Sequence, residues 1–551
     1  MLTKTGNLHL EIQTSRKSPV GILRTSFYEG GKTKHTQHGR ITGCSLSQLK
    51  MLQLALREKV IPENSPQAFQ IMESKEYGAS KALYELSLEL GLDKILYSRP
   101  EPWVNCALAM IIGRIVYAGS KLSLCHQQHN TALWEVCGVH DFIDVDKHCY
   151  LPMDRLLERQ KLIQKKLAQT HLKNGHLVLY DITSSYLEGE YDQSDLVDYG
   201  YNRDGKKGHA QIVIGLICND EGCPVGVEVF RGNTKDSTTV LDKIEEIRVL
   251  YGIQTVTFVG DRGMLTKHNL MNLQEEQEQG LDIITALTHQ DIQKLLEQDL
   301  IQPELFDDLN VCEVIDPENP KKRYCLCRNP VRAKKDQETR MRLLELTESE
   351  LEKIAHYKQA TTVEILGSRI GKILNKYKTG KYINWEIKAD QASLKSQEHQ
   401  VMWCRNEEKL RKETLLEGCY VITTTAPAEK MSSEEIVASY KSLILVEKAF
   451  RNLKTVQLEI RPIYHKKDDR IRSHAFLCML AYYVQWHMQR RVASLADEEE
   501  GKNRRWSFYN IIETLKQITQ NKVSVEGIEF YKVSQPTYDQ KRICDMMEIK
   551  I

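Results

Sequence analysis

Residues 176–181 read HLVLYD, a short apolar run that ends in an aspartate. Runs of this length and composition are typical of a strand buried within a sheet. Two more strand-like runs follow at residues 211–218 and 224–230, and the turn sequence NDEG separates them at 219–222. The spacing of the three runs predicts three antiparallel strands.

The chain then alternates helices and strands. A helical period covers residues 239–251, and a strand-like run at 255–259 leads into the sequence GDRG, whose aspartate is Asp261. A second helix is expected at 266–277 and a fifth strand at 282–287. Three strands followed by helix, strand, helix and strand are the plan of a ribonuclease-H-like mixed sheet.

A separate stretch, SYKSLILVEKAFRNLK at residues 439–454, supplies a third acid. At ~100° per residue in a helix, Tyr440, Glu447 and Lys454 fall within roughly 40° of one another. Arg451 lies beside them, and apolar residues fill the opposite side. We expect a helix that presents a carboxylate between cations and a phenol, which suits a phosphodiester and a metal ion. An ordinary surface helix with a charged side fits the same residues.

Groups at the ends of neighbouring strands in a mixed sheet converge in one crevice, so Asp181 and Asp261 are expected to meet. Two ionised carboxylates ~4 Å apart repel by about 4 kcal/mol at an effective dielectric constant of ~20, and a third acid adds to this cost. Clustered acids therefore imply bound cations. Hard oxygen ligands without a histidine or thiolate cluster favour Mg²⁺ over zinc. Because the chain has 75 acidic residues, aspartates that only cap turns remain an alternative at this point.

The order and spacing of these motifs resemble the DDE transposases of bacterial insertion sequences, in the branch with a Y-x2-R-x3-E-x6-K signature. The segment DITSSYLEG at residues 181–189 is similar to the first aspartate motif of that family, and DRGM at 261–264 to the second. Tyr440, Glu447 and Lys454 match the third motif at its spacing. Several motifs in one order are far more specific than any single one, so the resemblance favours a functional role for these acids.

The resemblance covers residues 175–485 and includes two further blocks, at 200–207 and 232–236. It departs from the family at one position, because Leu443 occupies the place of the signature arginine. Arg451, one turn beyond the glutamate, is a candidate for part of the missing charge.

The resemblance implies an enzyme that cuts double-stranded DNA at the terminal inverted repeats of a mobile element and joins the ends to target DNA. Asp181, Asp261 and Glu447 would be the catalytic residues and would hold two divalent ions ~3.5–4 Å apart, Mg²⁺ or alternatively Mn²⁺. The residues expected to contact DNA are Tyr440, Arg451, Lys454, Arg203, Lys206, Lys207, Arg262 and Trp385. A homodimer bound to two DNA ends is expected from the family alone.

The step from Asp261 to Glu447 exceeds what a compact sheet needs, so an inserted domain is expected, and the resemblance implies that it is β-rich. The predicted fold class is α+β and multidomain, with helices flanking the ribonuclease-H-like mixed sheet. Five segments are expected: a mainly helical domain at 1–170 that binds DNA ends, the first part of the catalytic core at 171–287, the insertion at 288–430, the second part of the core at 431–490, and a tail at 491–551 suited to dimer contacts.

Basic and aromatic residues interleave in two parts of the predicted insertion, as would suit contacts to phosphates and stacking on bases. One cluster lies at residues 321–335 and the other at 369–381, and Trp385 follows the second. Ordinary solvated loops and helix faces give the same pattern. A tryptophan packed inside the insertion is the plainer expectation for Trp385.

Composition sets broad limits on the 551-residue chain. A hydrophobic share of 41% and a charged share of 27% are ordinary for soluble proteins, and the net charge of +1 means that any DNA-binding surface must be local. The longest apolar run, 106–118, is shorter than the ~20 residues of a membrane span, and no charged-then-apolar leader is seen. We therefore expect a cytoplasmic protein with no membrane partner, and the resemblance implies that it is bacterial and nucleoid-associated. Fourteen cysteines without a CxxC pair indicate reduced thiols, not disulfides or a zinc framework.

Two other classes of function stay open. One is a different ribonuclease-H-like metal nuclease, such as a resolvase or repair enzyme, and the long insertion argues against it. The other is a catalytically inactive DNA-binding relic, and the presence of all three acids argues against that.

Overall fold

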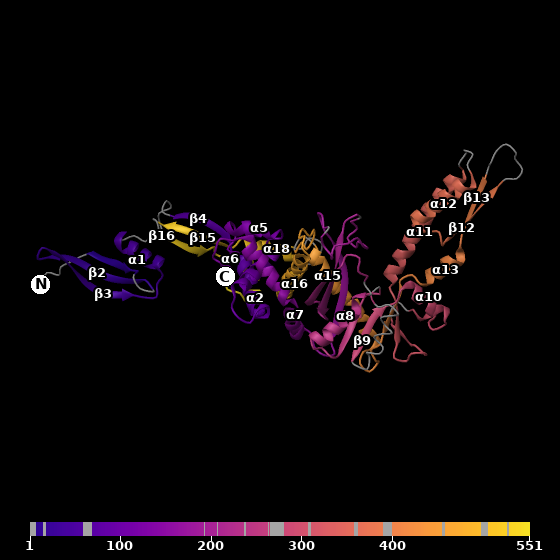
Figure 1. The fold of residues 1–551 in the computed structure, drawn as a ribbon, viewed down its shortest axis with the longest axis horizontal. Coiled ribbons are helices and arrows are strands. Elements are labelled where there is room, and N and C mark those ends of the chain that lie inside the picture. The colour runs from indigo at the N-terminus through magenta and orange to yellow at the C-terminus, as the bar shows by residue number, and fades with distance from the viewer. Residues whose placement is uncertain are drawn as a thin grey trace.

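The computed structural model shows an elongated molecule, with N-terminal strands at one end and a helical arm at the other (Figure 1). The largest sheet lies between them. The structure describes residues 7–14, 18–58, 69–191, 193–206, 208–235, 238–262, 264, 280–306, 310–356, 362–389, 399–454, 458–497, 505–525 and 528–551.

An eight-stranded mixed sheet in the order β10-β11-β14-β9-β8-β5-β6-β7 organises the molecule. Strands β5, β6 and β7 are antiparallel neighbours, whereas β8 runs parallel to β5 and β9 parallel to β8. Every residue of β6 is buried, so both faces of the sheet are covered there. The bounds are β5 Leu177–Tyr186, β6 Gln211–Asn219, β7 Pro224–Phe230, β8 Val256–Gly260 and β9 Leu281–Ala286.

Helices from distant parts of the chain pack against this sheet. α7 (Leu151–His171) and α16 (Asp468–Arg491) contact β7 and each other, and α15 (Leu443–Lys454) contacts β5 and β6. α16 is buried along most of its length, because α2 (Gly78–Glu89), α4 (Pro102–Val116) and α7 surround it together with the sheet. One continuous apolar core therefore joins the sheet to the N-terminal helices.

The predicted core strands are confirmed as β5 to β9, and the fold is α+β with a large mixed sheet, consistent with a ribonuclease-H-like core. One detail differs, because β5 continues to Tyr186 and Asp181 lies inside the strand, not at its end. The residues after Asp181 are β-branched, small or aromatic, so they continue to pair with β6. The helix expected at 266–277 lies outside the described residues.

The stretch 439–454 forms two helices. α14 (Ser433–Lys441) and α15 are separated by Ser442. The hydroxyl of Ser442 donates to the carbonyl oxygen three residues earlier over 2.6 Å, a local bond that competes with helix continuation. The prediction of one continuous helix is wrong, so Tyr440 and Glu447 come from different helices.

The segment between β9 and α14 has two parts. Near the sheet, β10 (Cys312–Ile315), β11 (Arg323–Arg328) and β14 (Cys419–Thr424) continue the sheet beyond β9, and α10 (His289–Glu297) packs on them around a small core. Farther out lies the arm, which has a separate core. Its elements are α11 (Pro330–Ala355), α12 (Val363–Tyr377), β12 (Ile383–Ala389), β13 (His399–Arg405) and α13 (Glu407–Leu415).

The expectation of a β-rich insertion is wrong, because helices dominate its described residues. α11 alone has 26 residues and α12 has 15, whereas the strands have four to seven each. After Pro330 the sequence of α11 contains no glycine or proline and is rich in glutamate, lysine, arginine and leucine, which favour helix.

The first strands of the chain form a small sheet of their own. β1 (Asn7–Gln13), β2 (Val20–Glu29) and β3 (Lys32–Ile41) pair antiparallel, and α1 (Leu46–Glu58) packs on β1. The helices α2 to α7 follow, so helix outweighs strand in the described part of residues 1–170.

The C-terminal tail returns to the N-terminal region. β15 (Thr519–Val525) pairs with both β16 (Ile528–Val533) and β4 (Phe69–Glu76). The amides of Tyr77 and Gly78 donate to the carbonyl oxygen of Ile518, each over 3.0 Å. The tail therefore completes a sheet within the chain, and a role in dimer contacts stays a prediction.

In the described part of the chain, no single helix is both long and apolar enough to cross a membrane. α4 and the segment Lys121–His129 meet the length and composition criteria only as a pair bent by 98°.

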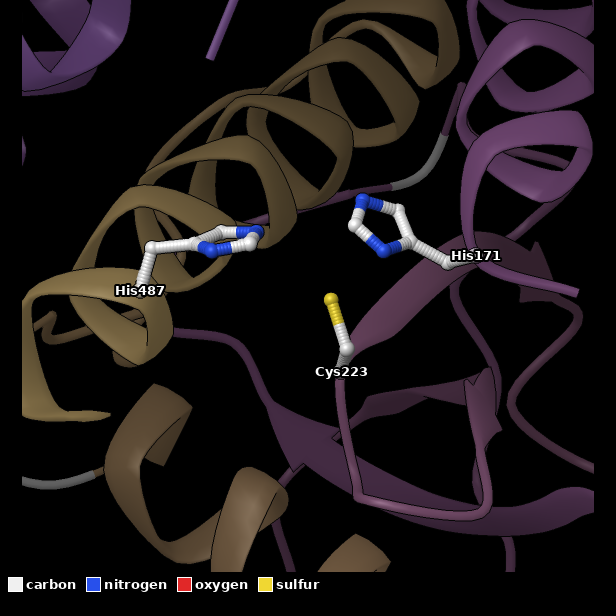
Figure 2. A group of neighbouring side chains, drawn as sticks. All are labelled: His171, Cys223 and His487. Atoms are coloured by element: carbon white, nitrogen blue, oxygen red, sulfur yellow. The ribbon is translucent and has the colours of Figure 1, made fainter. Parts of the chain in front are cut away.

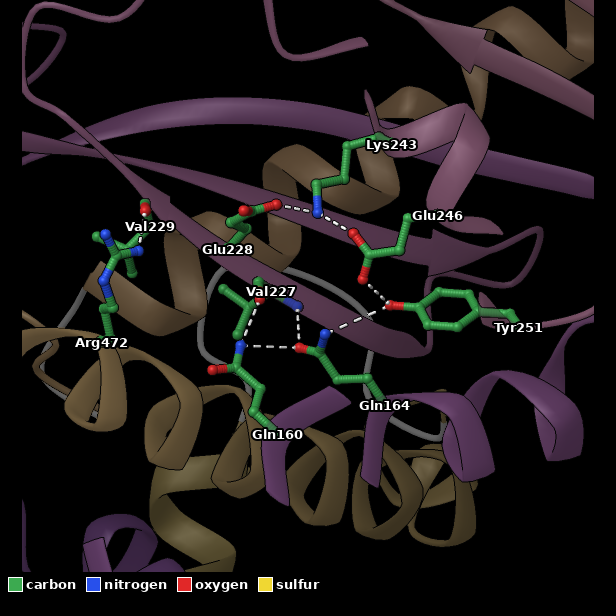
Figure 3. A network of polar contacts seen from close by, with 9 residues as sticks. All are labelled: Gln160, Gln164, Val227, Glu228, Val229, Lys243, Glu246, Tyr251 and Arg472. Carbon is green, nitrogen blue, oxygen red and sulfur yellow. Dashed lines mark hydrogen bonds and ion pairs between the residues drawn. The ribbon is translucent and has the colours of Figure 1, made fainter. Parts of the chain in front are cut away.

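A polar network holds α7 against the edge strand β7 (Figure 3). The amide of Val227 donates to Gln164 Oε1 over 2.8 Å, and Gln160 Nε2 donates to the carbonyl oxygen of Val227, also over 2.8 Å. Gln164 Nε2 donates to the hydroxyl of Tyr251 over 3.3 Å. These bonds satisfy backbone groups that an edge strand otherwise leaves open.

Charged residues surround this network. The buried ammonium of Lys243 pairs with Glu228 and Glu246, and Glu246 accepts a hydrogen bond from Tyr251 over 3.0 Å. Arg472 of α16 donates to the carbonyl oxygen of Val229 over 2.8 Å. All of these residues except Tyr251 line a hollow of about 710 Å³ that shares no residue with the acidic cavity described below.

We expect Gln164→Leu to lower the free energy of unfolding by about 1–3 kcal/mol, because the Val227 amide loses its acceptor in a buried place. Gln169→Leu is the matched control, since Gln169 is exposed near the end of the same helix. Urea denaturation of the two variants and the unmodified protein measures the effect. Equal loss of stability in both variants would contradict a specific role for the network.

Candidate active site

Asp181 and Asp261 lie side by side because of the parallel pairing of β5 and β8. Tyr180 is the partner of Gly260 in that pairing, and the two aspartates are the next residues along their strands. Adjacent strands lie ~4.8 Å apart, so this register brings the two carboxylates together. Since β8 ends at Gly260, Asp261 is exposed, whereas Asp181 is half-buried inside β5.

Glu447 reaches the same place from α15. Asp181, Asp261 and Glu447 line one cavity of about 370 Å³. The apolar side of α15 packs on the sheet, and Glu447 is exposed. The buried residues of α15 are Leu443, Val446, Ala449, Phe450 and Leu453.

In the described part of the chain, each aspartate accepts hydrogen bonds through one oxygen. Asp181 Oδ1 accepts from the amide of Ile182 over 2.7 Å. Asp261 Oδ1 accepts from the amide of Arg262 over 2.7 Å and from the hydroxyl of Tyr440 over 3.1 Å. Among the described residues, nothing donates to Oδ2 of either aspartate or to the Glu447 carboxylate, so these oxygens are available to cations.

The electrostatics of the site depend on burial and like charge. Burial raises the pKa of Asp181 to about 7, and the negative charges of Asp261 and Glu447 add to the shift. Burial and the charge of Asp261 also raise the pKa of Tyr440, which keeps its hydroxyl a proton donor. Without a cation Asp181 therefore gains and loses its proton near neutral pH, well above the range of an ordinary aspartate.

Several predicted DNA-binding residues lie at or near the cavity. Tyr440 and Arg262 line it. Arg203 is close enough to Asp181 to lower the pKa of that carboxyl. Lys206 Nζ lies 5.4 Å from the centroid of the Tyr186 ring, at the end of β5. Lys207 falls outside the described residues.

Lys454 and Arg451 do not line the cavity. Lys454 Nζ donates to Thr183 Oγ1 over 2.6 Å and to Asp204 Oδ1 over 2.8 Å, and Arg461 pairs with the same carboxylate at 2.5 Å. Burial lowers the pKa of Lys454, which its pairing with Asp204 opposes. Lys454 therefore ties the end of α15 to β5 in this structure, and Arg451 is exposed. Phosphate binding by either residue stays a prediction.

Trp385 lies on β12 in the arm, far from α15 (Figure 1). Its partner across the β12–β13 hairpin is Trp403, and Trp385 is 41% exposed. The structure does not bring Trp385 to the acidic cavity, so stacking on a base beside the cut has no support from this geometry.

The cavity also contains residues that the sequence patterns missed. Asn329 and Arg332 come from the start of α11, His289 from the start of α10, and Lys441 from the end of α14. The one available signal was that Arg332 belongs to the basic cluster at 321–335. That cluster is not a single surface, because its member Arg323 is buried in an ion pair.

Leu443, at the place of the signature arginine, is 8% exposed and borders the cavity. An apolar side chain there cannot bind a phosphate. Within the described residues, the lysines and arginines that border the cavity are Arg262, Arg332 and Lys441. These three residues are therefore better placed than Arg451 to supply the charge of the signature arginine that Leu443 replaces.

The model of the transposase DDE domain family matches residues 176–484, more than half of the chain. The chain therefore belongs to the DDE transposase family. No curated protein is similar enough in sequence to match it. Transposases of this family act on DNA, and they generally use divalent metal ions such as Mg²⁺.

We expect Asp181→Asn to stabilise the metal-free protein at pH 8 but not at pH 4. The folded-state pKa of about 7 lies above the value of ~4 for an unfolded aspartate. The contribution of the Asp181 proton to the stability of the folded protein is therefore fully present below pH 4 and is lost as pH rises through 7. Asparagine carries no such proton, so the variant should gain roughly 2–4 kcal/mol relative to the unmodified protein across this range.

Denaturation of chelator-treated protein at several pH values measures this difference. Asp195→Asn is the control, because Asp195 is exposed. The raised pKa of Asp181 would be contradicted if the stability difference between Asp181→Asn and the unmodified protein were the same at pH 4 and pH 8.

Proposed function

We propose that the protein is the transposase of a bacterial insertion sequence of the Y-x2-R-x3-E-x6-K branch. It would cut DNA at the terminal inverted repeats of the element and join these ends to target DNA. The observation that carries the proposal is the convergence of Asp181, Asp261 and Glu447 on one cavity. Acids that only cap turns have no reason to meet from two strands and a helix.

The donors at this cavity fit hard divalent cations. Mg²⁺ prefers oxygen ligands, and the three carboxylates have oxygens without protein donors among the described residues. Asp181, Asp261 and Glu447 would hold two Mg²⁺ ions, with Mn²⁺ as the alternative. When bound, the ions supply activation of the attacking water or 3′-hydroxyl and stabilisation of the leaving oxygen.

The protein groups around these acids hold them in position. Tyr440 and the Arg262 amide both donate to Asp261 Oδ1, so the carboxylate keeps one orientation. The Ile182 amide does the same for Asp181. This positioning costs no rearrangement when the DNA binds, because the donors are already in place.

Cations around the cavity would bind the phosphates next to the cut. Arg262 follows β8, Lys441 ends α14 and Arg332 begins α11, so positive charge approaches from three sides. Arginine binds phosphate through paired hydrogen bonds and lysine through its point charge. Arg203 and Lys206 would extend this contact beyond β5.

The strand β3 offers a surface for DNA ends. Its first seven residues are exposed. Its basic or titratable residues are Lys32, Lys34, His35, His38 and Arg40. This surface supports a DNA-end-binding role for residues 1–170, and two copies of the chain would be needed to hold both ends of an element.

We expect Asp181→Asn, Asp261→Asn and Glu447→Gln each to lower the rate of Mg²⁺-dependent cleavage of terminal-repeat DNA by on the order of 100-fold or more. Each change would remove a proposed metal ligand. Loss of a residue that only hydrogen-bonds to a metal ligand already lowers metal affinity or activity 10–100-fold in other metal proteins. Cleavage is followed on labelled DNA that carries the ends of the protein's own element, with the cut mapped to the nucleotide.

Glu434→Gln is the matched control, because Glu434 is exposed in the first turn of α14. Cleavage at the unmodified rate by the Asp181→Asn or Glu447→Gln protein would refute the proposal. Equal cleavage of DNA without terminal repeats would favour another metal nuclease. Binding without any cutting by the unmodified protein would favour an inactive relic.

We expect Arg332→Gln to weaken binding to terminal-repeat DNA and to reduce the slope of log K against log salt by ~0.9, the change for one lost phosphate contact. Arg342→Gln on the exposed side of the same helix should leave the slope unchanged. Fluorescence anisotropy at several salt concentrations measures both slopes, and identical slopes for the two variants would contradict a phosphate contact by Arg332.

A further inference from the structure

Two histidines and a cysteine from three distant segments converge outside the acidic cavity (Figure 2). His171 ends α7, Cys223 lies in the turn before β7, and His487 lies near the end of α16. One ligand atom from each residue lies within 4.8 Å of the other two. Figure 2 shows the three side chains pointing toward a common centre.

The surroundings of both imidazoles favour the neutral form, which is the form that binds metals. Burial lowers the pKa of His171, and burial together with nearby cationic groups lowers the pKa of His487 to about 3. Nε2 of His171 lies 3.0 Å from the hydroxyl of Tyr483, which leaves Nδ1 for another partner. Nε2 of His487 is buried and has no hydrogen-bond partner among the described residues.

We propose that His171, Cys223 and His487 bind one zinc ion, with a water molecule as the fourth ligand. Zinc binds imidazole nitrogen and thiolate sulfur in tetrahedral sites. The Tyr483 hydroxyl would hold the orientation of the His171 ring through its contact with Nε2, as hydrogen-bond partners of metal-binding histidines usually do. The donors differ from the oxygen set of the acidic cavity, so this site would select a different metal.

The geometry needs only a small closure to hold zinc. Bonds of ~2.0–2.3 Å around a tetrahedral ion place ligand atoms roughly 3.3–3.7 Å apart, so the side chains must approach by about 1 Å. Burial raises the pKa of Cys223, so its thiol is protonated without metal. Binding would release that proton to solvent and leave the thiolate on zinc, which makes zinc affinity rise with pH.

The proposed ion would join three parts of the fold. It would connect the last residue of the N-terminal helices, the β6–β7 turn and the central helix α16. The turn also supports the active site, because Gly222 lies against Leu445 of α15 so closely that an added Cβ would be 2.9 Å from the Leu445 Cβ. A turn fixed by zinc would therefore restrict the movement of α15, the helix that carries Glu447. The zinc site itself does not depend on the proposed function.

The full-length protein, purified without chelator, should contain about one zinc per chain by elemental mass spectrometry. Cys223→Ala and His487→Gln should lose it. The matched controls Cys218→Ala, a buried thiol on β6, and His176→Gln, an exposed histidine, should keep it. Asp181→Asn should also keep it, which separates this site from the catalytic cations.

A second measurement does not require a variant to fold. Chelator-treated unmodified protein titrated with Co²⁺ should develop a thiolate-to-cobalt charge-transfer band and the visible bands of a tetrahedral site, and zinc should remove them. Removal of zinc should also lower the Tm. Absence of zinc together with absence of the cobalt bands would overturn the proposal, as would copper in place of zinc or zinc retained in both Cys223→Ala and His487→Gln.

Discussion

The pairing of Tyr180 with Gly260 makes neighbours of Asp181 and Asp261, and the rest of the site follows from that contact. Two like charges at adjacent strands repel, and burial of one of them adds a desolvation cost, which is why the pKa of Asp181 rises to about 7. The fold relieves this cost only in part, through the hydrogen bond of the Ile182 amide to Asp181 and the positive charge of Arg203. A cation bound here would offset the cost of the Asp181 charge, so the same contact that destabilises the empty site favours metal binding.

The insertion is held against this site by a second buried charge. Arg323 of β11 binds Glu313 of β10 through two hydrogen bonds of 2.8 Å, and it donates to the carbonyl oxygens of Ala426 and Met431 over 2.7 and 3.0 Å. Ser433, the first residue of α14, also donates to Glu313. The path into the insertion and the path out of it are thus tied together. As a consequence the start of α11, with Arg332, stays beside the cavity while the rest of the arm extends away.

The sequence predicted the sheet better than it predicted the site. The strands β5 to β9 have clear apolar runs and turn signals, so they could be predicted without coordinates. The break at Ser442 could not, because a local hydroxyl bond overrides a helical period that continues across it. Arg332 was hidden for another reason: nothing in a run of basic residues tells which one faces a cavity and which, like Arg323, is buried in a pair. Lys454 shows the same limit, since its spacing from Glu447 fits the family while its ammonium bonds to Asp204.

The cysteine pattern had the opposite weakness. Fourteen thiols without a CxxC pair indicated no zinc framework, and that inference covers only sites whose ligands are close in sequence. His171, Cys223 and His487 come from two helices and a turn, so only the packing of α7 and α16 on β7 brings them together. The acidic cavity offers oxygen donors, which hard cations such as Mg²⁺ prefer. The histidines and the cysteine offer nitrogen and sulfur donors, which suit borderline cations such as zinc. A chain with both sets could therefore bind one metal for catalysis and another for structure, because Mg²⁺ has little affinity for imidazole and thiolate donors.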